Sequence, residues 1–262
     1  MQVTAKLGWL LPLALIIPSF AQKTSSAGRM RLQPTQQIRK GVDAWPLIAN
    51  PKDDAERKIN GSIAELNADL ARRLKACDAN YSESMESQFG KERETGELAK
   101  VWTHRVTTTM AGPAYLSFLS TTDFFCGGAH PYGYTEIAIF DLTTGEPANP
   151  LAWFEPSAKI SYGEETESDR FLERSVSTSD LLPVYRELTR HECDDTYPVD
   201  QPFLVWPDAK FGTVMIQADH LPGCCEACGI AVSLKPEQAR KLGFSESFLQ
   251  AIDEAHRTVL RP

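Results

Sequence analysis

The chain has 262 residues, of which 42% are hydrophobic and 24% are charged, and its formal net charge is −8. The apolar residues are spread along the length without a collagen period or a long low-complexity tract, which excludes fibrous and wholly disordered proteins. A chain of this size buries about 70–75% of its unfolded surface, so it can form a core of its own. The acidic balance argues against nucleic acid and anionic membrane surfaces as partners, because phosphate binding requires a basic face.

The N-terminus has the pattern of a secretory signal peptide. Lys6 precedes an apolar run over residues 7–17, and the small-x-small pattern of Ser19-Phe20-Ala21 follows. The run is too short to span a hydrocarbon core about 30 Å thick, which disfavours the alternative of an uncleaved membrane anchor. We therefore expect a signal peptide over residues 1–21, a mature chain without a transmembrane anchor, and a periplasmic or secreted location.

The next segment is polar and shows no period, so we interpret residues 22–41 as a flexible leader and residues 42–262 as the folded region. Asn50 and Pro51, followed by acidic residues, mark the start of a helix. Apolar residues then repeat at steps of three and four, which predicts an amphipathic helix docked on a flat surface. This stripe consists of Ile59, Ile63, Leu66, Leu70, Leu74 and Cys77.

Strand patterns rich in β-branched and aromatic residues follow over 101–109, 115–120 and 137–140, with a turn at Gly112-Pro113. They predict an antiparallel meander. Further along, a helix is expected near 181–188, three more strands over 203–206, 213–217 and 230–234, and a final helical region over 236–260. This order predicts an α+β fold in which helices pack on one face of an antiparallel sheet.

The motif Gly127-Gly128-Ala129-His130-Pro131, an apolar strand, and Asp141-Leu142-Thr143-Thr144-Gly145 follow one another in the middle of the chain. This segment resembles the extracellular domain of RsiV-type anti-sigma factors, which also forms the non-catalytic N-terminal part of some peptidoglycan deacetylases. Residues 45–48 and 58–60 are similar to the entry into the helix of that family. Residues 211–214 and 230–234 are similar to its closing strands, so the resemblance covers about 42–240.

The resemblance implies an α+β cell-envelope binding domain, and in the anti-sigma members this domain binds lysozyme. We find no cytoplasmic sigma-binding segment, transmembrane helix or deacetylase domain in the sequence, so the signalling and deacetylase roles are not carried over. The expected function is that of an exported, non-enzymatic binding module with a basic protein such as lysozyme, or a cell-wall glycan, as its ligand. No cofactor is expected.

The candidate binding surface is the loop from Gly127 to Tyr134, because its two glycines turn the backbone and its rings suit recognition. The expected ligand-binding residues are Gly127, Gly128, His130, Tyr132 and Tyr134. The alternatives are a shaped loop in which His130 bonds a backbone carbonyl, or a catalytic or metal-binding role for His130. Asp141 is interpreted as a turn residue rather than a catalyst.

Six cysteines follow the expected cleavage site, namely Cys77, Cys126, Cys193, Cys224, Cys225 and Cys228. In an exported chain, disulfides are the first interpretation. We predict that Cys77 pairs with Cys126, since they end a predicted helix and a predicted strand, and that Cys193 is bridged to one of the downstream three.

The alternatives for the downstream cysteines are a zinc site with His191 and His220, or a redox-active pair of Cys225 and Cys228. Common hydrolase, metalloprotease and nucleotide-binding motifs are missing from the sequence. The enzymatic alternative is therefore a periplasmic hydrolase or thiol oxidoreductase that uses His130 or the cluster of Cys193, Cys224, Cys225 and Cys228. A purely structural envelope protein is the third possibility.

Overall fold

The computed structural model describes residues 30–89, 102–128, 130–162, 175–190, 193, 197–221, 225 and 228–260. The expected signal peptide lies outside these ranges and stays a prediction. Within them, no helix combines the length and the hydropathy that a membrane span requires.

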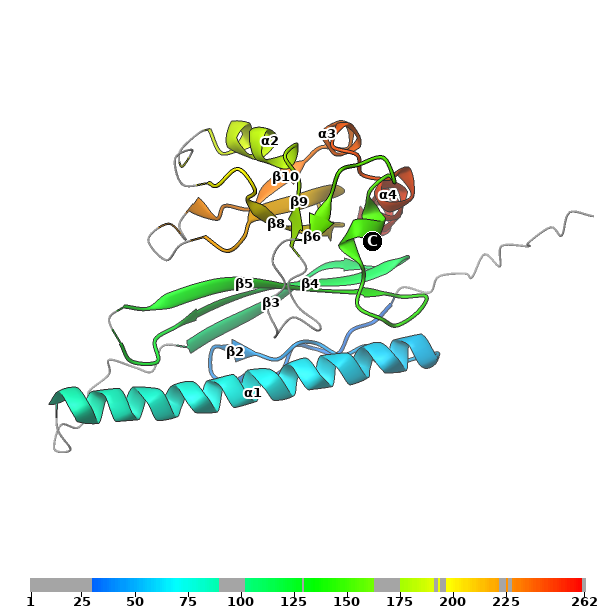
Figure 1. Cartoon of the computed structure of the whole chain (residues 1–262). Coiled ribbons are helices and arrows are strands. Elements are labelled where there is room, and N and C mark those ends of the chain that lie inside the picture. Colours follow the sequence, from blue (N-terminus) through cyan, green and yellow to red (C-terminus); the bar gives the residue numbers. More distant parts are fainter. Residues whose placement is uncertain are drawn as a thin grey trace, which may run out of the picture.

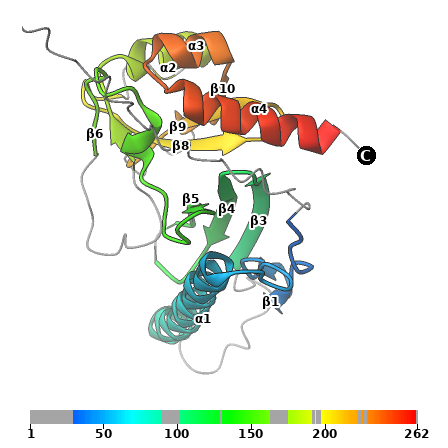
Figure 2. The ribbon, with the colours of Figure 1, turned by 90° about the vertical axis from the view of Figure 1, so that its right-hand side faces the viewer.

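Two five-stranded sheets pack face to face, and helices cover the outer face of each (Figures 1 and 2). The first sheet has the order β1-β2-β3-β4-β5, and its pairs are antiparallel except β2 with β3. Its strands are β1 (Gln37–Arg39), β2 (Val42–Asp43), β3 (Trp102–Ala111), β4 (Tyr115–Phe124) and β5 (Tyr132–Asp141). The meander of β3, β4 and β5 confirms the pattern predicted from the sequence.

The long helix α1 (Asp54–Phe89) lies along the outer face of the first sheet (Figure 1). Its predicted apolar stripe is buried, because Ile59 and Ile63 pack in one cluster with Phe118 of β4 and Phe140 of β5. Two asparagines on α1 fix the chain that precedes it, since Asn60 and Asn67 each exchange two hydrogen bonds with the backbone of residues 48 and 45.

Part of the expected flexible leader belongs to the fold. Leu32 forms a β-bridge with Ile48, and residues 37–39 form β1 beside β2. Leu32 also packs against the cluster beneath α1. The sequence does not predict this structure, because a short edge strand exposes most of its side chains and therefore shows no clear hydrophobic period.

The second sheet has the order β10-β9-β8-β7-β6, with all neighbours antiparallel. Its strands are β6 (Ser161–Tyr162), β7 (Val176–Ser177), β8 (Pro202–Asp208), β9 (Thr213–Ala218) and β10 (Val232–Leu234). The remaining helices are the 3₁₀ helix η1 (Pro150–Trp153), α2 (Leu181–Leu188), α3 (Pro236–Lys241) and α4 (Glu246–Leu260). The helices α2, α3 and α4 cover the outer face of this sheet (Figures 1 and 2).

The final helical region, expected to run over 236–260, is divided into α3 and α4. Gly243 has a φ of +84°, a left-handed conformation that ends a helix. A Cβ on Gly243 would lie 3.0 Å from the Cβ of Ala158, so the chain passes close to a neighbouring loop at this break. The expected helical region is therefore present, with an interruption at residues 242–245.

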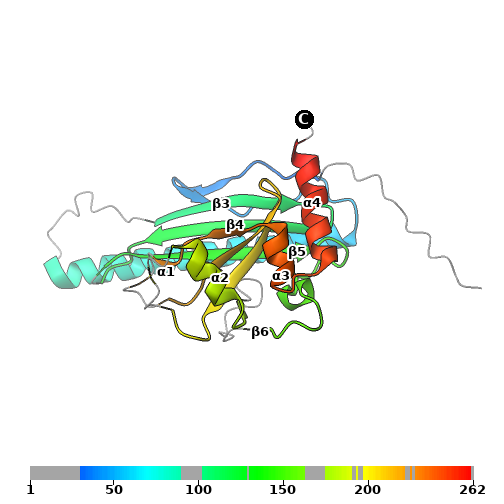
Figure 3. The ribbon, with the colours of Figure 1, turned by 90° about the horizontal axis from the view of Figure 1, so that it is seen from above.

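The inner faces of the two sheets share one hydrophobic core, and their strands cross each other (Figure 3). Met110, Ile137 and Ile139 of the first sheet pack into the same cluster as β8, β9 and α4. A backbone hydrogen bond of 2.8 Å from the amide of Ala209 to the carbonyl of Thr109 joins the sheets directly. The α+β class is confirmed, while the division of the strands into two stacked sheets goes beyond the sequence prediction.

At one end the sheets are held together by aromatic packing. The rings of Trp153 and Phe248 stack with centroids 4.6 Å apart and an interplanar angle of 6°. Tyr115, at the start of β4, meets both rings edge-on at 5.9 and 5.8 Å. The site described next lies at the opposite end, where β4 ends and β5 begins.

Candidate functional site: the cleft between the sheets

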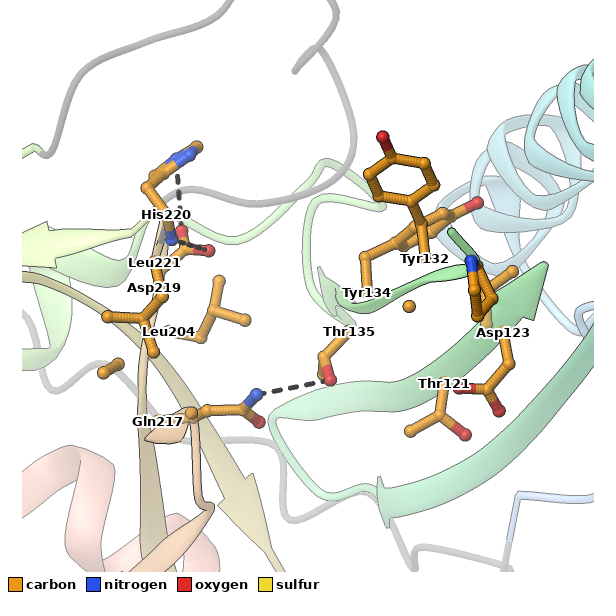
Figure 4. Close-up of a pocket in the computed structure, with 15 residues that line it drawn as sticks. Thr121, Asp123, Tyr132, Tyr134, Thr135, Leu204, Gln217, Asp219, His220 and Leu221 are labelled. Carbon is orange, nitrogen blue, oxygen red and sulfur yellow. Dashed lines mark hydrogen bonds and ion pairs between the residues drawn. The ribbon is translucent and has the colours of Figure 1, made fainter. Parts of the chain in front are cut away.

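An open cleft of about 750 Å³ separates the two sheets where β4 ends and β5 begins (Figure 4). One wall comes from residues 121–123 and 131–135 of the first sheet. The other comes from Leu204 and from residues 217–221 at the end of β9, with Gly229. The volume lies within the range of about 300–1,000 Å³ that is typical of small-ligand sites.

The two walls are joined by a hydrogen bond between side chains. Gln217 Nε2 of β9 donates to Thr135 Oγ1 of β5 at 3.3 Å, as Figure 4 shows. The next residue on the same face of β5, Ile137, already belongs to the apolar core between the sheets. The cleft therefore ends at this bond on a packed core, and its inner end offers an amide and a hydroxyl.

Asp123 and Gly133 are direct cross-strand partners on the first wall. Asp123 is exposed, and its Oδ2 accepts a hydrogen bond from the Thr103 hydroxyl of β3 at 3.3 Å. A Cβ on Gly133 would lie only 3.0 Å from Asp123 Oδ1. The glycine therefore leaves room for the carboxylate.

Asp219 and His220 provide the polar groups of the second wall. Asp219 Oδ1 accepts from the backbone N–H of His220 at 2.8 Å, and Oδ2 lies 3.3 Å from His220 Nε2. His220 has a φ of +52°, and Gln201 Nε2 donates to the carbonyl of Asp219 at 2.5 Å. These contacts fix the backbone at the end of β9 and therefore the direction of the Asp219 side chain.

The cleft has an acidic character. Its lining contains Asp123 and Asp219 but neither Lys nor Arg among the residues that the structure describes. The remaining polar groups are threonine hydroxyls, the Gln217 amide and the His220 imidazole. Such a surface suits neutral or cationic ligands and repels anions.

An aromatic group stands at the rim. Tyr132 is 44% exposed, and its ring stacks on Phe124 with a centroid distance of 5.9 Å and an interplanar angle of 26°. The ring of His130 lies 4.3 Å from that of Tyr132. Tyr134, two residues along and on the same face of β5, points toward α1 (Figure 4). Its hydroxyl accepts from Arg73 Nη1 at 2.8 Å. Tyr132 is thus the exposed member of the predicted pair, and both tyrosines lie in β5 rather than in the predicted loop.

His130 is exposed and does not line the cleft. Its Nδ1 lies 3.0 Å from the carbonyl oxygen of Pro131. This contact matches the alternative interpretation of a shaped loop in which the imidazole meets a backbone carbonyl.

The two predicted glycines lie where the chain leaves β4 and passes over α1. Gly127 has a φ of +86°, and a Cβ there would lie 2.6 Å from the Cβ of Ser84. Gly128 has a φ of +115°, with open space around it. Gly127 therefore permits a close approach between loop and helix, which is a structural reason for its presence.

A disulfide between Cys77 and Cys126 fixes the same loop to α1, which is the pairing predicted from the sequence. The rings of Tyr81 and Phe125 meet edge-on beside it at 5.9 Å.

The segment from Asp141 to Gly145 also contacts α1, because Gly145 lies against the backbone of Ala55. Asp141 is a turn residue as predicted, since its Oδ1 accepts from the backbone N–H groups of residues 143 and 144.

Cys193 is bonded to Cys228, one of the three downstream cysteines. With both sulfurs in the disulfide, neither is a thiolate for zinc, and Cys225 does not form a dithiol pair with Cys228. His191 and Cys224 lie outside the described residues, so the expected disulfide role of Cys224 and Cys225 stays a prediction. In the described part of the chain, no group of three or more His, Cys, Asp or Glu side chains is placed to hold a metal ion.

Sequence reasoning missed Asp123, Gln217 and Asp219 as candidate site residues. A signal was present for Asp123, because Thr121 and Asp123 continue the alternation of the strand predicted over 115–120 and therefore share a polar face. No local pattern marks Asp219, whose position depends on how the second sheet stacks on the first.

No protein-family model matches the sequence, and no curated protein matches it. Among solved structures, the chain is similar to a crystal structure of a member of the DUF3298 family from Bacteroides fragilis. The two are 12% identical, the match covers 86% of this chain and 95% of the other, and the TM-score is 0.49. A similarity at this level assigns neither a family nor a function.

Proposed function

We propose that this chain is an exported, non-enzymatic binding module of the cell envelope, and that it holds a cell-wall glycan in the cleft between its two sheets. One observation carries the proposal: an open, polar cleft has an exposed tyrosine at its rim. The resemblance of residues 127–145 to an extracellular domain supports the location and the binding role.

The groups around the cleft match the chemistry of sugars. Carboxylates accept hydrogen bonds from sugar hydroxyls, while threonine hydroxyls and the Gln217 amide both donate and accept. Tyr132 presents an apolar ring face with a polar tip, and its stacking on Phe124 holds the ring in place. The cleft provides polar contacts for the edges of sugar units, and Tyr132 at its rim provides an apolar contact for the face of a sugar unit.

The enzymatic alternative has less support. His130 lies outside the cleft lining and contacts a backbone carbonyl. Cys193 and Cys228 are bonded to each other, so neither of these two offers a thiolate in this structure. We therefore base the proposal on binding.

A basic protein such as lysozyme is the second candidate ligand, because a net charge of −8 and two aspartates in the cleft attract cations. Electrostatic attraction of this kind acts mainly on the association rate, and salt weakens it. Lysozyme binding is therefore expected to fall steeply with salt, whereas binding of a neutral glycan is not.

The test is calorimetry with peptidoglycan-derived glycan fragments and with lysozyme, each at low and at physiological salt. Tyr132→Ala is the test variant, and Phe211→Ala is the matched control, since Phe211 is 61% exposed beyond the other end of β9. We expect glycan binding that Tyr132→Ala weakens and Phe211→Ala leaves unchanged. Absence of heat with every fragment would overturn the glycan proposal, and heat with lysozyme alone would favour the second candidate.

A further inference from the structure

Going beyond the proposed function, we propose that the free edge of β5 beside the cleft binds an extended segment of a basic partner protein as an added β-strand. The segment pairs with the backbone of Gly133 and Thr135 and places a Lys or Arg side chain against the carboxylate of Asp123. Neither contact involves a sugar, so this inference holds or fails separately from glycan binding.

The outer edge of β5 follows from its place in the sheet. β5 is the last strand of the first sheet, so its ladder with β4 pairs only one of its two edges. Alternate residues of an antiparallel strand direct their N–H and C=O groups to opposite sides. The carbonyl of Ile139 and the amide of Asp141 bond to the segment 146–148 outside the ladder. The backbone groups of Gly133 and Thr135 therefore also point away from β4.

The chain itself occupies the position beside β5, but at the far end of the strand. Pro147 forms an antiparallel bridge with Phe140, and the hydrogen bonds on either side of it measure 2.8 and 2.9 Å. Within the described residues, no backbone hydrogen bond reaches the outward groups of Gly133 or Thr135. A strand added there lies in line with residues 146–148 and extends a pairing that the chain begins.

This stretch lacks the features that usually keep a sheet edge from pairing. Natural edge strands are often very short, bulged, or protected by Pro or Lys. Residues 133–137 contain neither Pro nor Lys, and the register with β4 runs without a shift from Tyr132 to Asp141. Gly133 and Thr135 also line the open cleft. The edge is therefore regular, and the cleft gives a strand access to it.

Asp123 determines the chemistry of the partner. Its carboxylate lies over Gly133, since a Cβ on that glycine would be 3.0 Å from Oδ1. Because Asp123 and Gly133 are cross-strand partners, the residue that pairs with Gly133 on an added strand is the next one in the same row. A Lys or Arg there reaches the carboxylate over the glycine, which has no side chain in the way.

The carboxylate of Asp123 is not neutralised by its neighbours. Among the described residues it accepts from the Thr103 hydroxyl at 3.3 Å and forms no ion pair. Arg105, on the same face, belongs to β3 and lies one strand farther from the edge. The net charge of −8 adds a general attraction for a basic partner.

Hydrogen exchange measured by NMR tests the backbone pairing. The probe is a synthetic seven-residue peptide with threonine and valine at alternate positions and a lysine at its centre. In the free protein, the amides of Gly133 and Thr135 are expected to exchange faster than those of Tyr134 and Glu136, which face β4. Saturating peptide is expected to slow exchange at Gly133 and Thr135 by about tenfold. Absence of binding, or binding without this protection, would overturn the inference.

Two substitutions at one position separate the backbone from the side chain. Thr135→Pro removes the outward N–H without removing a hydrogen bond to β4, and edge strands accept proline in this orientation. Thr135→Val keeps the N–H and loses the same hydroxyl, which bonds to Gln217. We expect about tenfold weaker peptide binding for Thr135→Pro and little change for Thr135→Val. Equal weakening by both would show that the edge backbone does not bind the peptide.

The peptide itself supplies a test that does not depend on the folding of Thr135→Pro. Methylation of the peptide amides that face β5 is expected to weaken binding to the wild type by about tenfold, because an added strand needs these N–H groups. Methylation of the amides on the other side is the matched control. Equal affinity of the two methylated peptides would contradict strand addition.

The charge contact is tested by replacing the central lysine of the peptide with glutamine. We expect about threefold weaker binding, as for an exposed ion pair, and Asp123→Asn should remove the difference. Glu155→Gln is the control, because this exposed carboxylate lies outside the cleft, and it should retain the difference. A preference for lysine that Asp123→Asn leaves unchanged would overturn the role of Asp123.

The remaining outcomes separate this inference from its rivals. Protection of Gly133 and Thr135 that rises with protein concentration without peptide would assign the edge to a second copy of the chain and overturn the basic partner. Binding of glycan fragments without binding of the peptide would overturn this inference alone. Peptide binding without glycan binding would overturn only the proposed function.

Discussion

Arg73 of α1 donates a hydrogen bond of 2.8 Å to Glu136 of β5, whose residue surface is only 4% exposed. The same guanidinium donates to the hydroxyl of Tyr134. Its Nε also lies 2.9 Å from Oδ2 of Asp69, which precedes Arg73 by one helical turn. These contacts attach the helix to the strand that carries Tyr132. The rim of the cleft is therefore supported from the far side of the sheet.

Replacement of Arg73 is expected to destabilise the protein strongly. Arg73→Met leaves the carboxylate of Glu136 buried without its cation, a loss of about 3 kcal/mol in the free energy of unfolding. Arg72→Met is the matched control, because the Arg72 side chain is 71% exposed and its ion pair within the described ranges is with Asp69. This variant should cost less than about 1 kcal/mol. Urea unfolding measures both. Equal costs for the two variants would contradict a structural role for the buried pair.

The disulfide between Cys77 and Cys126 is expected to stabilise the fold and to fix the loop that follows it. The double variant Cys77→Ser/Cys126→Ser should lose about 2–4 kcal/mol, because the bridge closes a segment with a sequence separation of 49 residues. Removal of the Cys193–Cys228 bridge should cost a similar amount, since its separation is 35. Hydrogen exchange distinguishes them, with faster exchange at residues 125–128 expected only for the first variant.

Replacement by alanine is expected to have opposite effects on stability at Gly127, which contacts α1, and at Gly61, which lies within α1. Gly127→Ala places a Cβ 2.6 Å from Ser84 at a positive φ, so a loss of more than about 1 kcal/mol is expected. Gly61→Ala places a methyl group in open space on the helix, and a gain of about 0.5–1 kcal/mol is expected. Thermal unfolding gives both signs, and a neutral Gly127→Ala would mean that the loop does not approach the helix as described.

Some of this structure follows from local sequence patterns. The stripe from Ile59 to Leu74 predicts α1 because its spacing depends only on the helical period, and the alternation in residues 101–109 predicts β3 in the same way. The position of Asp219 opposite Asp123 does not follow, since strand patterns do not determine which sheets stack or where they separate. The direction of Tyr134 depends on Arg73, which lies 61 residues away in the sequence.

Stability is expected to fall as the pH is lowered below neutrality because of His104. This histidine of β3 is fully buried, and its Nδ1 lies 2.6 Å from the backbone carbonyl of Asp43. Burial holds the pKa of His104 below its ordinary value, although the contact with that carbonyl opposes the shift. The unfolded chain, with a histidine pKa of about 6.5, then binds more protons than the folded one.

Above a pH of about 6.5, His104 is neutral in both the folded and the unfolded chain and does not reduce stability. Below that pH the unfolded chain takes up the proton first, so the free energy of unfolding decreases until the pH reaches the lower pKa of the folded state. Urea unfolding at a series of pH values from about 8 to 5 measures this slope. In His104→Phe the aromatic contact with Trp45, 5.6 Å away in the wild type, can be kept while the titrating group is removed. A variant whose unfolding free energy depends on pH as steeply as that of the wild type would show that other groups cause the loss.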